Sequence, residues 1–202
     1  EQVIKGAEEI ESIKIEKNRI SVITTNLFKV LGPKKTILSG CGGAASYIDP
    51  EKLPIIQSDF QTTNTFISDM LKSTLSSDIH RITGGIHVVA LAGSQQIITI
   101  AEDIGRHNAL DRVIGYALRK GIDLSHTFVI ASGRISSEMA RKCLVAHIPL
   151  IVSRGATTSL SLEIAEKNGL TVVGFVRGSK MNIYTHPGRI ILEKREAPPL
   201  PD

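Results

Sequence analysis

The chain contains no tryptophan, only two cysteines among its 202 residues, and 4% aromatic residues. The cysteines, Cys41 and Cys143, lie far apart and lack the short spacing of metal ligands, so a disulfide framework is not expected. This cysteine usage is typical of a protein from a reducing, cytoplasmic compartment. Because few aromatic residues are present for base stacking and the formal net charge is only +4, we expect no nucleic-acid partner.

Several other signals are also missing. No apolar run approaches the length of a membrane span, and the first ten residues lack the basic-then-apolar pattern of a signal peptide, so we expect no membrane partner. The sequence has no Walker loop, no Cys-x-x-Cys and no Gly-x-Ser-x-Gly. It begins with Glu1 rather than methionine, so we expect it to be part of a longer protein. Its length suits one domain with a small appendage.

The periodicity of the apolar residues predicts an α/β protein. Alternating residues at 10–15 and 20–25 predict a small N-terminal β-hairpin. The predicted helices are 61–75, 106–119, 136–146 and 158–168, and the later strands are 87–92, 97–101, 127–131, 150–153, 171–176, 182–185 and 189–192. We therefore expect a small β region with the loop around Cys41 in residues 1–60, an α/β domain in residues 61–195 and an extended tail in residues 196–202. In helix 106–119 the predicted apolar stripe is Leu110, Val113, Ile114, Ala117 and Leu118.

Four strands of the α/β domain run into a glycine and an arginine, in the segments IITIAEDIGR, FVIASGR, LIVSRG and VVGFVRG. Glycine lets a backbone approach a ligand closely, and arginine offers a fork of donors suited to phosphate. Helical crossovers make the last strands parallel, which places their carboxyl ends at one edge of the sheet. We expect Arg134, Arg154 and Arg177 to converge there and to hold a large, multiply anionic ligand.

Cys41 is the candidate reactive residue. Glycines flank it in the sequence SGCGG, which predicts an exposed thiol, and Lys34 and Lys35 favour the thiolate, the reactive form. The alternative is a chance cysteine in a flexible loop. Cys143 follows Met139 by four residues on the apolar face of a predicted helix, so we expect it in the core.

A dense polar run follows the second hairpin strand and opens a helix. A helix N-terminus offers free N–H groups and a positive dipole end, so this junction attracts anions. Glu102 and Asp103 are candidates to accept from guanine-type N–H groups or from a ribose; the alternative is a helix cap with salt bridges to Arg106 and Arg112. For Arg106 and its neighbour His107 we favour a binding role. The candidates in this run are Glu102, Asp103, Gly105, Arg106, His107 and Asn108.

Three further junctions carry candidate residues. Gly84 and Gly85 allow a close backbone approach ahead of His87, although a lone histidine that opens a strand is more often structural. The other two junctions each join a strand end to a helix start, in the sequences SGR and SRGATT. Their candidates are Ser132, Gly133, Arg134, Ser153, Arg154 and Thr157, and N-capping by Ser136 and by Thr157 or Thr158 is compatible with binding.

The order helix, hairpin, helix, strand is similar to the cytidine deaminase architecture. Those enzymes hold zinc with a His or Cys beside a Glu and with a Pro-Cys-x-x-Cys motif. At the corresponding helix starts, residues 103–108 and 132–137, this chain has no cysteine. Zinc-dependent deamination is therefore not expected.

Taken together, these motifs resemble the FdhD family, the formate dehydrogenase accessory sulfurtransferases. The resemblance covers about residues 41–184 and rests on EDIGRHNALD, SGRISSEM, SRGATT, and GFVRG followed by MNIY. It implies a cytidine-deaminase-like, three-layer α/β fold with a mixed sheet and no zinc. It adds Asn182 to the candidate cofactor-binding residues, which also include Arg177, and makes Cys41 the catalytic residue.

The resemblance also implies a function. A cytoplasmic homodimer would accept persulfide sulfur from a cysteine desulfurase and pass it to bis-molybdopterin guanine dinucleotide, carrying molybdenum or tungsten, before that cofactor enters the catalytic subunit of formate dehydrogenase. Such a cofactor has two pyrophosphates and two guanines. Arginines 106, 134, 154 and 177 suit the pyrophosphates, and Glu102 or Asp103 suits the guanines.

The chain departs from the family at one position. The family's reactive loop usually reads Cys-Gly-x-Cys-Gly, whereas Ala44 takes the place of the second cysteine here. A relay through two cysteines is therefore not expected, but a persulfide needs only one attachment point, which Cys41 provides. Two alternatives stay open: a non-catalytic chaperone that binds the guanine-nucleotide cofactor, and a cysteine hydrolase that pairs Cys41 with His87 or His107, which no motif supports.

Overall fold

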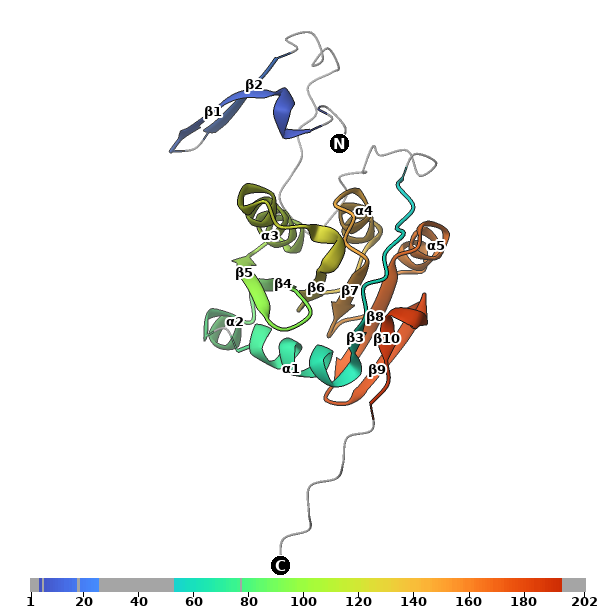
Figure 1. The fold of residues 1–202 in the computed structure, drawn as a ribbon. Coiled ribbons are helices and arrows are strands. Elements are labelled where there is room, and N and C mark those ends of the chain that lie inside the picture. Colours follow the sequence, from blue (N-terminus) through green and yellow to red (C-terminus); the bar gives the residue numbers. More distant parts are fainter. Residues whose placement is uncertain (1–3, 5, 18, 26–52, 77, 194–202) are drawn as a thin grey trace, which may run out of the picture. The chain divides into compact units, whose positions relative to one another are not determined.

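The computed structural model describes residues 4, 6–17, 19–25, 53–76 and 78–193. The chain divides into two units, an N-terminal hairpin unit and an α/β unit (Figure 1). None of the helices in these described stretches is both long enough and apolar enough to cross a membrane.

The hairpin unit contains the predicted β-hairpin. A short 3-10 helix, η1 (Ala7–Glu9), leads into β1 (Ile10–Glu16), which pairs antiparallel with β2 (Arg19–Thr24). Ile13 lies opposite Val22, and Ile15 lies opposite Ile20. The alternating pattern of residues 10–25 therefore predicted this element correctly.

A six-stranded mixed sheet forms the centre of the α/β unit. The strand order is β5-β4-β6-β7-β8-β9. Strands β6, β7 and β8 run parallel, and β4, β5 and β9 join through antiparallel pairings. The bounds are β4 (His87–Ala92), β5 (Ile97–Asp103), β6 (Phe128–Ala131), β7 (Leu150–Ser153), β8 (Thr171–Arg177) and β9 (Lys180–Thr185).

Helices cover both faces of this sheet and create three layers (Figure 1). One face carries α1 (Asn64–Thr74); the other carries α3 (Arg106–Lys120), α4 (Ser137–Val145) and α5 (Ser159–Asn168). The core between α1 and the sheet includes Ile67 of α1 and Phe128 and Ile130 of β6. Phe128 and Ile130 are two positions apart, so they point to the same face of the sheet. The expected three-layer α/β fold with a mixed sheet and an N-terminal hairpin is confirmed.

Local signals set the helix ends. Ser136 caps α4 by accepting from Met139 N, and Thr158 caps α5 by accepting from Ser161 N. Gly121 and Gly169 end α3 and α5 in the left-handed conformation, at φ 65° and 75°. The expected Ser136 cap is confirmed, and of the two expected candidates for the α5 cap the structure selects Thr158.

The predicted apolar stripe of α3 is too wide. Leu118 is 66% exposed, and the buried residues are Ala109, Leu110, Val113 and Ala117. Because α3 packs on the sheet along one narrow line, residues on the shoulder of the stripe face solvent.

The last predicted strand does not join the main sheet. Strand β10 (Ile190–Ile191), which follows the 3-10 helix η4 (Pro187–Arg189), pairs in parallel with β3 (Thr62–Thr63). The sequence also missed α2 (Asp78–Thr83) and the 3-10 helix η3 (Leu124–His126). All of these elements are short, so they carry little periodic signal.

The extended stretch before β3 packs on the α/β unit. Leu53, Ile56 and Phe60 are buried, and Ile56 N donates to the carbonyl of Asn168 at 2.9 Å. These residues therefore add to the core beside the amino ends of the parallel strands.

Candidate functional site

One edge of the sheet collects the predicted site residues that the structure describes. Strands β6, β7 and β8 end there, as does β5, and β4 begins there, since His87 lies opposite Asp103 and Ala131 lies opposite both Val89 and Ser153. Helices α3, α4 and α5 begin just beyond these strand ends. We call this edge the glycine edge, after Gly133, Gly155 and Gly174.

Two loops of the glycine edge are locked together. Ile135 N donates to Ala156 O at 2.9 Å, and Thr158 N donates to Ile135 O at 3.1 Å. The Ser153 hydroxyl donates to the carbonyl of Gly133 at 2.6 Å and accepts from Gly155 N at 2.8 Å. These bonds hold the loop after β6 against the loop after β7.

Close packing requires Gly155, in the loop after β7, and Gly174, within the neighbouring strand β8. A Cβ on Gly155 would lie 3.0 Å from the backbone nitrogen of Arg134, and a Cβ on Gly174 would lie 3.1 Å from Cγ2 of Thr157 and from Cε2 of Tyr184. The glycines therefore allow neighbouring backbone and side chains to approach them closely. This packing explains why glycine stands at these positions, whether or not a ligand binds there.

His87, Gly133 and Arg106 come together from three elements. A Cβ on Gly133 would lie 2.7 Å from Nδ1 of His87 and 3.7 Å from Cδ of Arg106. Ser132 continues the pairing of β4 and β6, because its N–H donates to Val88 O at 2.9 Å and its hydroxyl accepts from Val88 N at 3.0 Å. Ser132 therefore positions the start of β4, where His87 lies.

The junction between β5 and α3 gives Asp103 a structural role in the turn, although no side chain caps α3. One carboxylate oxygen of Asp103 accepts from Gly105 N at 2.9 Å and from the side-chain amide of Asn108 at 3.2 Å. Arg112 donates to the backbone carbonyl of Glu102 at 2.7 Å rather than to its carboxylate. Both acids are half-buried residues at the end of β5, and Asp103 orders the turn into α3.

His107 in the first turn of α3 contacts the first turn of α4. Its Nε2 lies 3.2 Å from the hydroxyl of Ser136. Burial is the main cause that lowers the pKa of His107 below 6.5, and the charge of Arg106 lowers it further. The imidazole is therefore neutral at physiological pH.

Three arginines follow the ends of the parallel strands. Arg134, Arg154 and Arg177 are exposed after β6, after β7 and at the end of β8. Arg177 donates to the backbone carbonyl of Arg154 and, at 3.0 Å, to that of Val176. The structure thus places these guanidinium groups along one edge.

The remaining predicted residues lie at the ends of this edge. Gly84, at φ 58°, and Gly85 link α2 to β4, and Gly85 N donates to the Thr83 hydroxyl at 3.2 Å. On β9, the Asn182 side chain donates to the Tyr184 hydroxyl at 3.2 Å.

Phe175 is a site candidate that sequence reasoning missed. It adopts a left-handed φ of 53°, is 45% exposed, and its N–H donates to Gly155 O at 3.0 Å. The pairing of β8 with β9 is irregular between Gly174 and Arg177, which turns Phe175 outward. Its position in an apolar strand predicts burial, and no local signal reveals the bulge.

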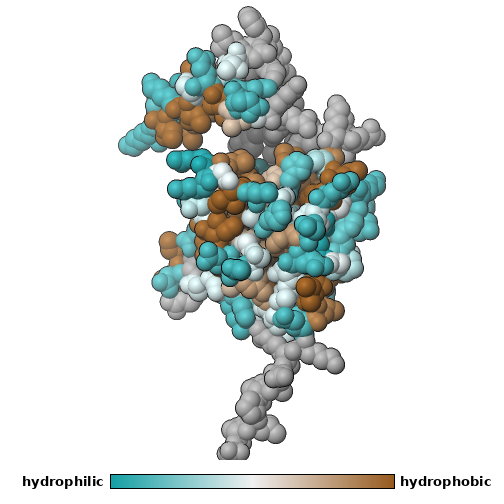
Figure 2. Space-filling view, in the orientation of Figure 1, coloured by the Kyte–Doolittle hydropathy of each residue, from teal (hydrophilic) through white to brown (hydrophobic). Residues whose placement is uncertain are grey.

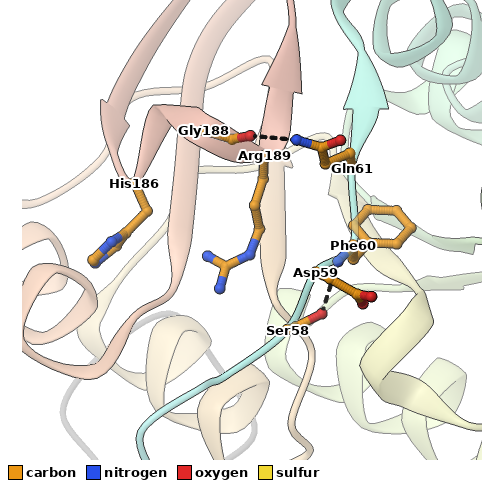
Figure 3. A pocket seen from close by; sticks show the side chains of 7 residues that line it. All are labelled: Ser58, Asp59, Phe60, Gln61, His186, Gly188 and Arg189. Carbon is orange, nitrogen blue, oxygen red and sulfur yellow. Dashed lines mark hydrogen bonds between the residues drawn. The ribbon is translucent and has the colours of Figure 1, made fainter.

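The pocket in Figure 3 does not coincide with the glycine edge. It measures about 300 Å³ and is lined by residues that include Ser58, His186 and Arg189. Arg189 donates to Gly169 O at 2.7 Å and to the hydroxyl of Thr171, the first residue of β8. The pocket therefore lies at the opposite edge of the sheet, away from the candidate residues of the glycine edge.

Only one of the two cysteines belongs to the described part of the chain. Cys41 lies outside the described residues. Cys143 is fully buried in α4, and burial raises its pKa to about 12, so its predicted core position is confirmed. The described part of the chain holds no cluster of three or more His, Cys, Asp or Glu side chains able to bind a metal ion.

Comparisons with known proteins agree with the sequence resemblance. The chain is 39% identical to the sulfur carrier protein FdhD of Wolinella succinogenes, over 95% of this chain and 70% of that protein. It is 36% identical to the sulfur carrier protein FdhD of Sulfolobus acidocaldarius, over 95% of this chain and 77% of that protein. A Desulfotalea psychrophila crystal structure, proposed to be a formate dehydrogenase accessory protein, matches with a TM-score of 0.76 and 29% identity over 93% of this chain and 74% of that one. The family model described as the FdhD/NarQ family matches residues 1–191. The chain therefore belongs to the FdhD/NarQ family.

Proposed function

We propose that this protein is a cytoplasmic sulfur carrier that takes persulfide sulfur onto Cys41 from a cysteine desulfurase. It passes this sulfur to the bis-molybdopterin guanine dinucleotide cofactor of a formate dehydrogenase. The observation that carries the proposal is the glycine edge, with its three arginines and three helix N-termini, in a chain whose named relatives are sulfur carriers.

Loading is a simple exchange between thiols. The Cys41 thiolate attacks the outer sulfur of the desulfurase persulfide, a new S–S bond forms, the old one breaks, and the desulfurase cysteine leaves as a thiolate. No net oxidation occurs and one thiol is sufficient, so Ala44 in place of the family's second cysteine does not prevent this step.

Delivery regenerates the Cys41 thiolate. The outer persulfide sulfur is bound by the metal of the cofactor, and the S–S bond breaks. Two electrons from the reduced metal convert that sulfur to sulfide, so charge and atoms balance without a further reductant.

The glycine edge suits the nucleotide parts of this cargo. Arg134, Arg154 and Arg177 offer donor forks for pyrophosphate, and the N-terminus of α5, which follows Arg154 in the chain, adds the positive end of a helix dipole. Phe175 presents an exposed ring on which a guanine can stack, held in a left-handed conformation that costs about 1–3 kcal/mol and is typical of functional sites.

Two assays test the two halves of the proposal. Cys41→Ser should abolish activation of formate dehydrogenase in cells that lack their own carrier, whereas Cys143→Ala should retain activation wherever the folded protein accumulates. Arg154→Ala should weaken GDP binding by about tenfold or more, since charge-assisted hydrogen bonds are lost. Arg119→Ala, in the last turn of α3, is the matched control. Full activation by Cys41→Ser would refute the carrier role.

Ala44 keeps one second function open, that of a non-catalytic chaperone for the cofactor. Such a chaperone would bind GDP at the glycine edge but would gain no sulfur on Cys41. A persulfide that moves from Cys41 to the cofactor would exclude it.

A homodimer is part of the same proposal. Apolar side chains are exposed over β5 and α3 (Figure 2), where Ile100 and Leu118 are 44% and 66% exposed. An exposed apolar surface beside an edge strand is a suitable contact for a second copy. Ile100→Glu should shift a dimer toward monomer in light scattering.

A further inference from the structure

The pocket in Figure 3, which we call the Arg189 pocket, is built from two segments that lie far apart in the sequence. One segment is residues 58–61, in the extended stretch before β3, and the other is residues 186–189, at η4. The side-chain amide of Gln61 donates to Gly188 O at 3.0 Å, and β3 pairs with β10 directly beyond the two segments. The walls of the pocket are therefore tied together without any ligand.

One edge of the Arg189 guanidinium group has no partner. Nη1 donates to Gly169 O at 2.7 Å and to the Thr171 hydroxyl at 3.0 Å, which holds the side chain in place. Nε is buried without a hydrogen-bond partner within the described residues, and Nη2 makes no hydrogen bond with them either. Nε–H and one Nη2–H point in parallel along the same edge of the planar group. Because a buried donor without a partner is costly and rare, this edge lacks an acceptor.

The charge of Arg189 is unpaired as well. The residue is half-buried, and no carboxylate in the described part of the chain forms an ion pair with it. Burial lowers the pKa of Arg189, and no neighbouring carboxylate offsets this effect. Asp59 lines the same pocket, but Figure 3 shows its carboxylate pointing away from the guanidinium group. Charged groups that proteins bury are usually paired, so the partner that Arg189 lacks is an anion.

The rest of the lining favours a small anion with a single charge. Two other donors are already used, since the Ser58 hydroxyl donates to Ser125 O and His186 Nε2 donates to Glu166 O, each at 3.0 Å. The Glu166 carboxylate lies 3.9 Å from the same His186 nitrogen, so a second negative charge on the ligand would be repelled. Two parallel donors match the two oxygens of a carboxylate. A volume of about 300 Å³ is at the lower end for small-molecule pockets and is too small for the proposed dinucleotide cargo.

We propose that the Arg189 pocket binds a small monocarboxylate, whose two oxygens accept hydrogen bonds from Nε–H and Nη2–H of Arg189. The carboxylate supplies both the acceptor and the negative charge that the half-buried guanidinium group lacks. Because the pocket lies beside the first residue of β8, at the opposite edge of the sheet from the glycine edge, it is a second binding site. The inference does not depend on sulfur transfer, and its failure would leave the proposed function unchanged.

Nitrogen-15 NMR of the arginine Nε–H groups tests this site directly in the whole wild-type protein. Butyrate is the probe, and butyramide, which has nearly the same shape but no charge, is the matched control. Butyrate should shift the Arg189 Nε–H signal until it saturates and should leave the signal of Arg119, in the last turn of α3, unchanged. Butyramide and chloride should shift neither signal. The absence of a saturable shift with butyrate, or an equal shift with butyramide or chloride, would overturn the proposal.

Two other ligands define the specificity of the pocket in the same wild-type experiment. Inorganic phosphate should bind more weakly than butyrate, and equal or tighter phosphate binding would overturn the choice of a monocarboxylate. GDP, which the proposed function assigns to the glycine edge, should leave the Arg189 signal unchanged. A GDP titration that moves this signal would overturn the independence of the two sites.

A variant tests the role of the fork. Arg189→Lys keeps the charge but loses the two parallel donors, so butyrate binding should weaken by about tenfold or more, as measured on the backbone amide signals of residues 186–189. Arg119→Lys should bind butyrate as the wild type does. Unchanged affinity in Arg189→Lys would overturn the proposed contact. The titrations of the wild type need no variant, so they decide the matter if Arg189→Lys fails to fold.

Discussion

Replacing Gly155 by alanine should separate the two locked loops of the glycine edge. The added methyl group would lie 3.0 Å from the backbone nitrogen of Arg134, 3.1 Å from the carbonyl carbon of Gly133 and 3.2 Å from Cα of Arg134. All three atoms belong to backbone, so no side chain can rotate away. The loops must move apart by a few tenths of an ångström against the bonds between Ile135, Ala156 and Thr158.

The expected cost follows from this geometry. Overpacking of this kind costs about 1–3 kcal/mol, which for a chain of this length lowers Tm by about 2–12 °C. Because the arginines of the edge extend from these loops, GDP affinity should also fall while the protein remains folded at room temperature.

Gly115→Ala provides the matched control. Gly115 lies inside α3, and a Cβ there would meet no heavy atom within 4 Å. Alanine is favoured over glycine in a helix by up to about 1 kcal/mol, so this variant should melt about 2–4 °C higher and bind GDP normally. Calorimetric melting and GDP titration of both variants test whether the two loops are as closely packed at Gly155 as the structure indicates. A Gly155→Ala protein with unchanged Tm and unchanged affinity would refute the close approach of the loops.

Three further outcomes are expected. Burial lowers the pKa of His107 in the folded protein below 6.5, so the unfolded chain binds a proton that the folded chain does not, and the free energy of unfolding should fall as the pH drops below 6.5. Urea titrations at several pH values should show a weaker dependence of this free energy on pH for His107→Asn. An unchanged dependence would contradict the shift. Cys143, with a pKa of about 12, should resist alkylation in the folded protein and react once denatured, as peptide mass spectrometry can show; rapid labelling of the native protein would contradict its burial. Thr158→Ala should cost about 1 kcal/mol in chemical denaturation because the cap of α5 is lost, whereas Thr158→Ser should retain most of it; equal losses would argue against capping.

The sequence predicted long periodic elements well, because their burial pattern is repeated over many residues. The hairpin of β1 and β2, the four main helices and the six strands of the sheet were all expected, and the parallel order of β6, β7 and β8 placed Arg134, Arg154 and Arg177 at one edge.

What the sequence missed depends on contacts between distant segments. The pairing of β10 with β3 joins residues 62–63 to 190–191, and two-residue strands carry no period. The outward turn of Phe175 arises from a bulge against β9, and the link from His107 to Ser136 crosses 29 positions. Strand ends and glycines were visible in the sequence, whereas the hydrogen bonds that connect them were not.

Intact-protein mass spectrometry after incubation with a cysteine desulfurase, cysteine and pyridoxal phosphate tests the central claim most directly. The proposal predicts one added sulfur on the wild type that a reductant removes, the same addition on Cys143→Ala, and none on Cys41→Ser. An unmodified wild-type protein, or equal addition to wild type and Cys41→Ser, would contradict a sulfur carrier that acts through Cys41.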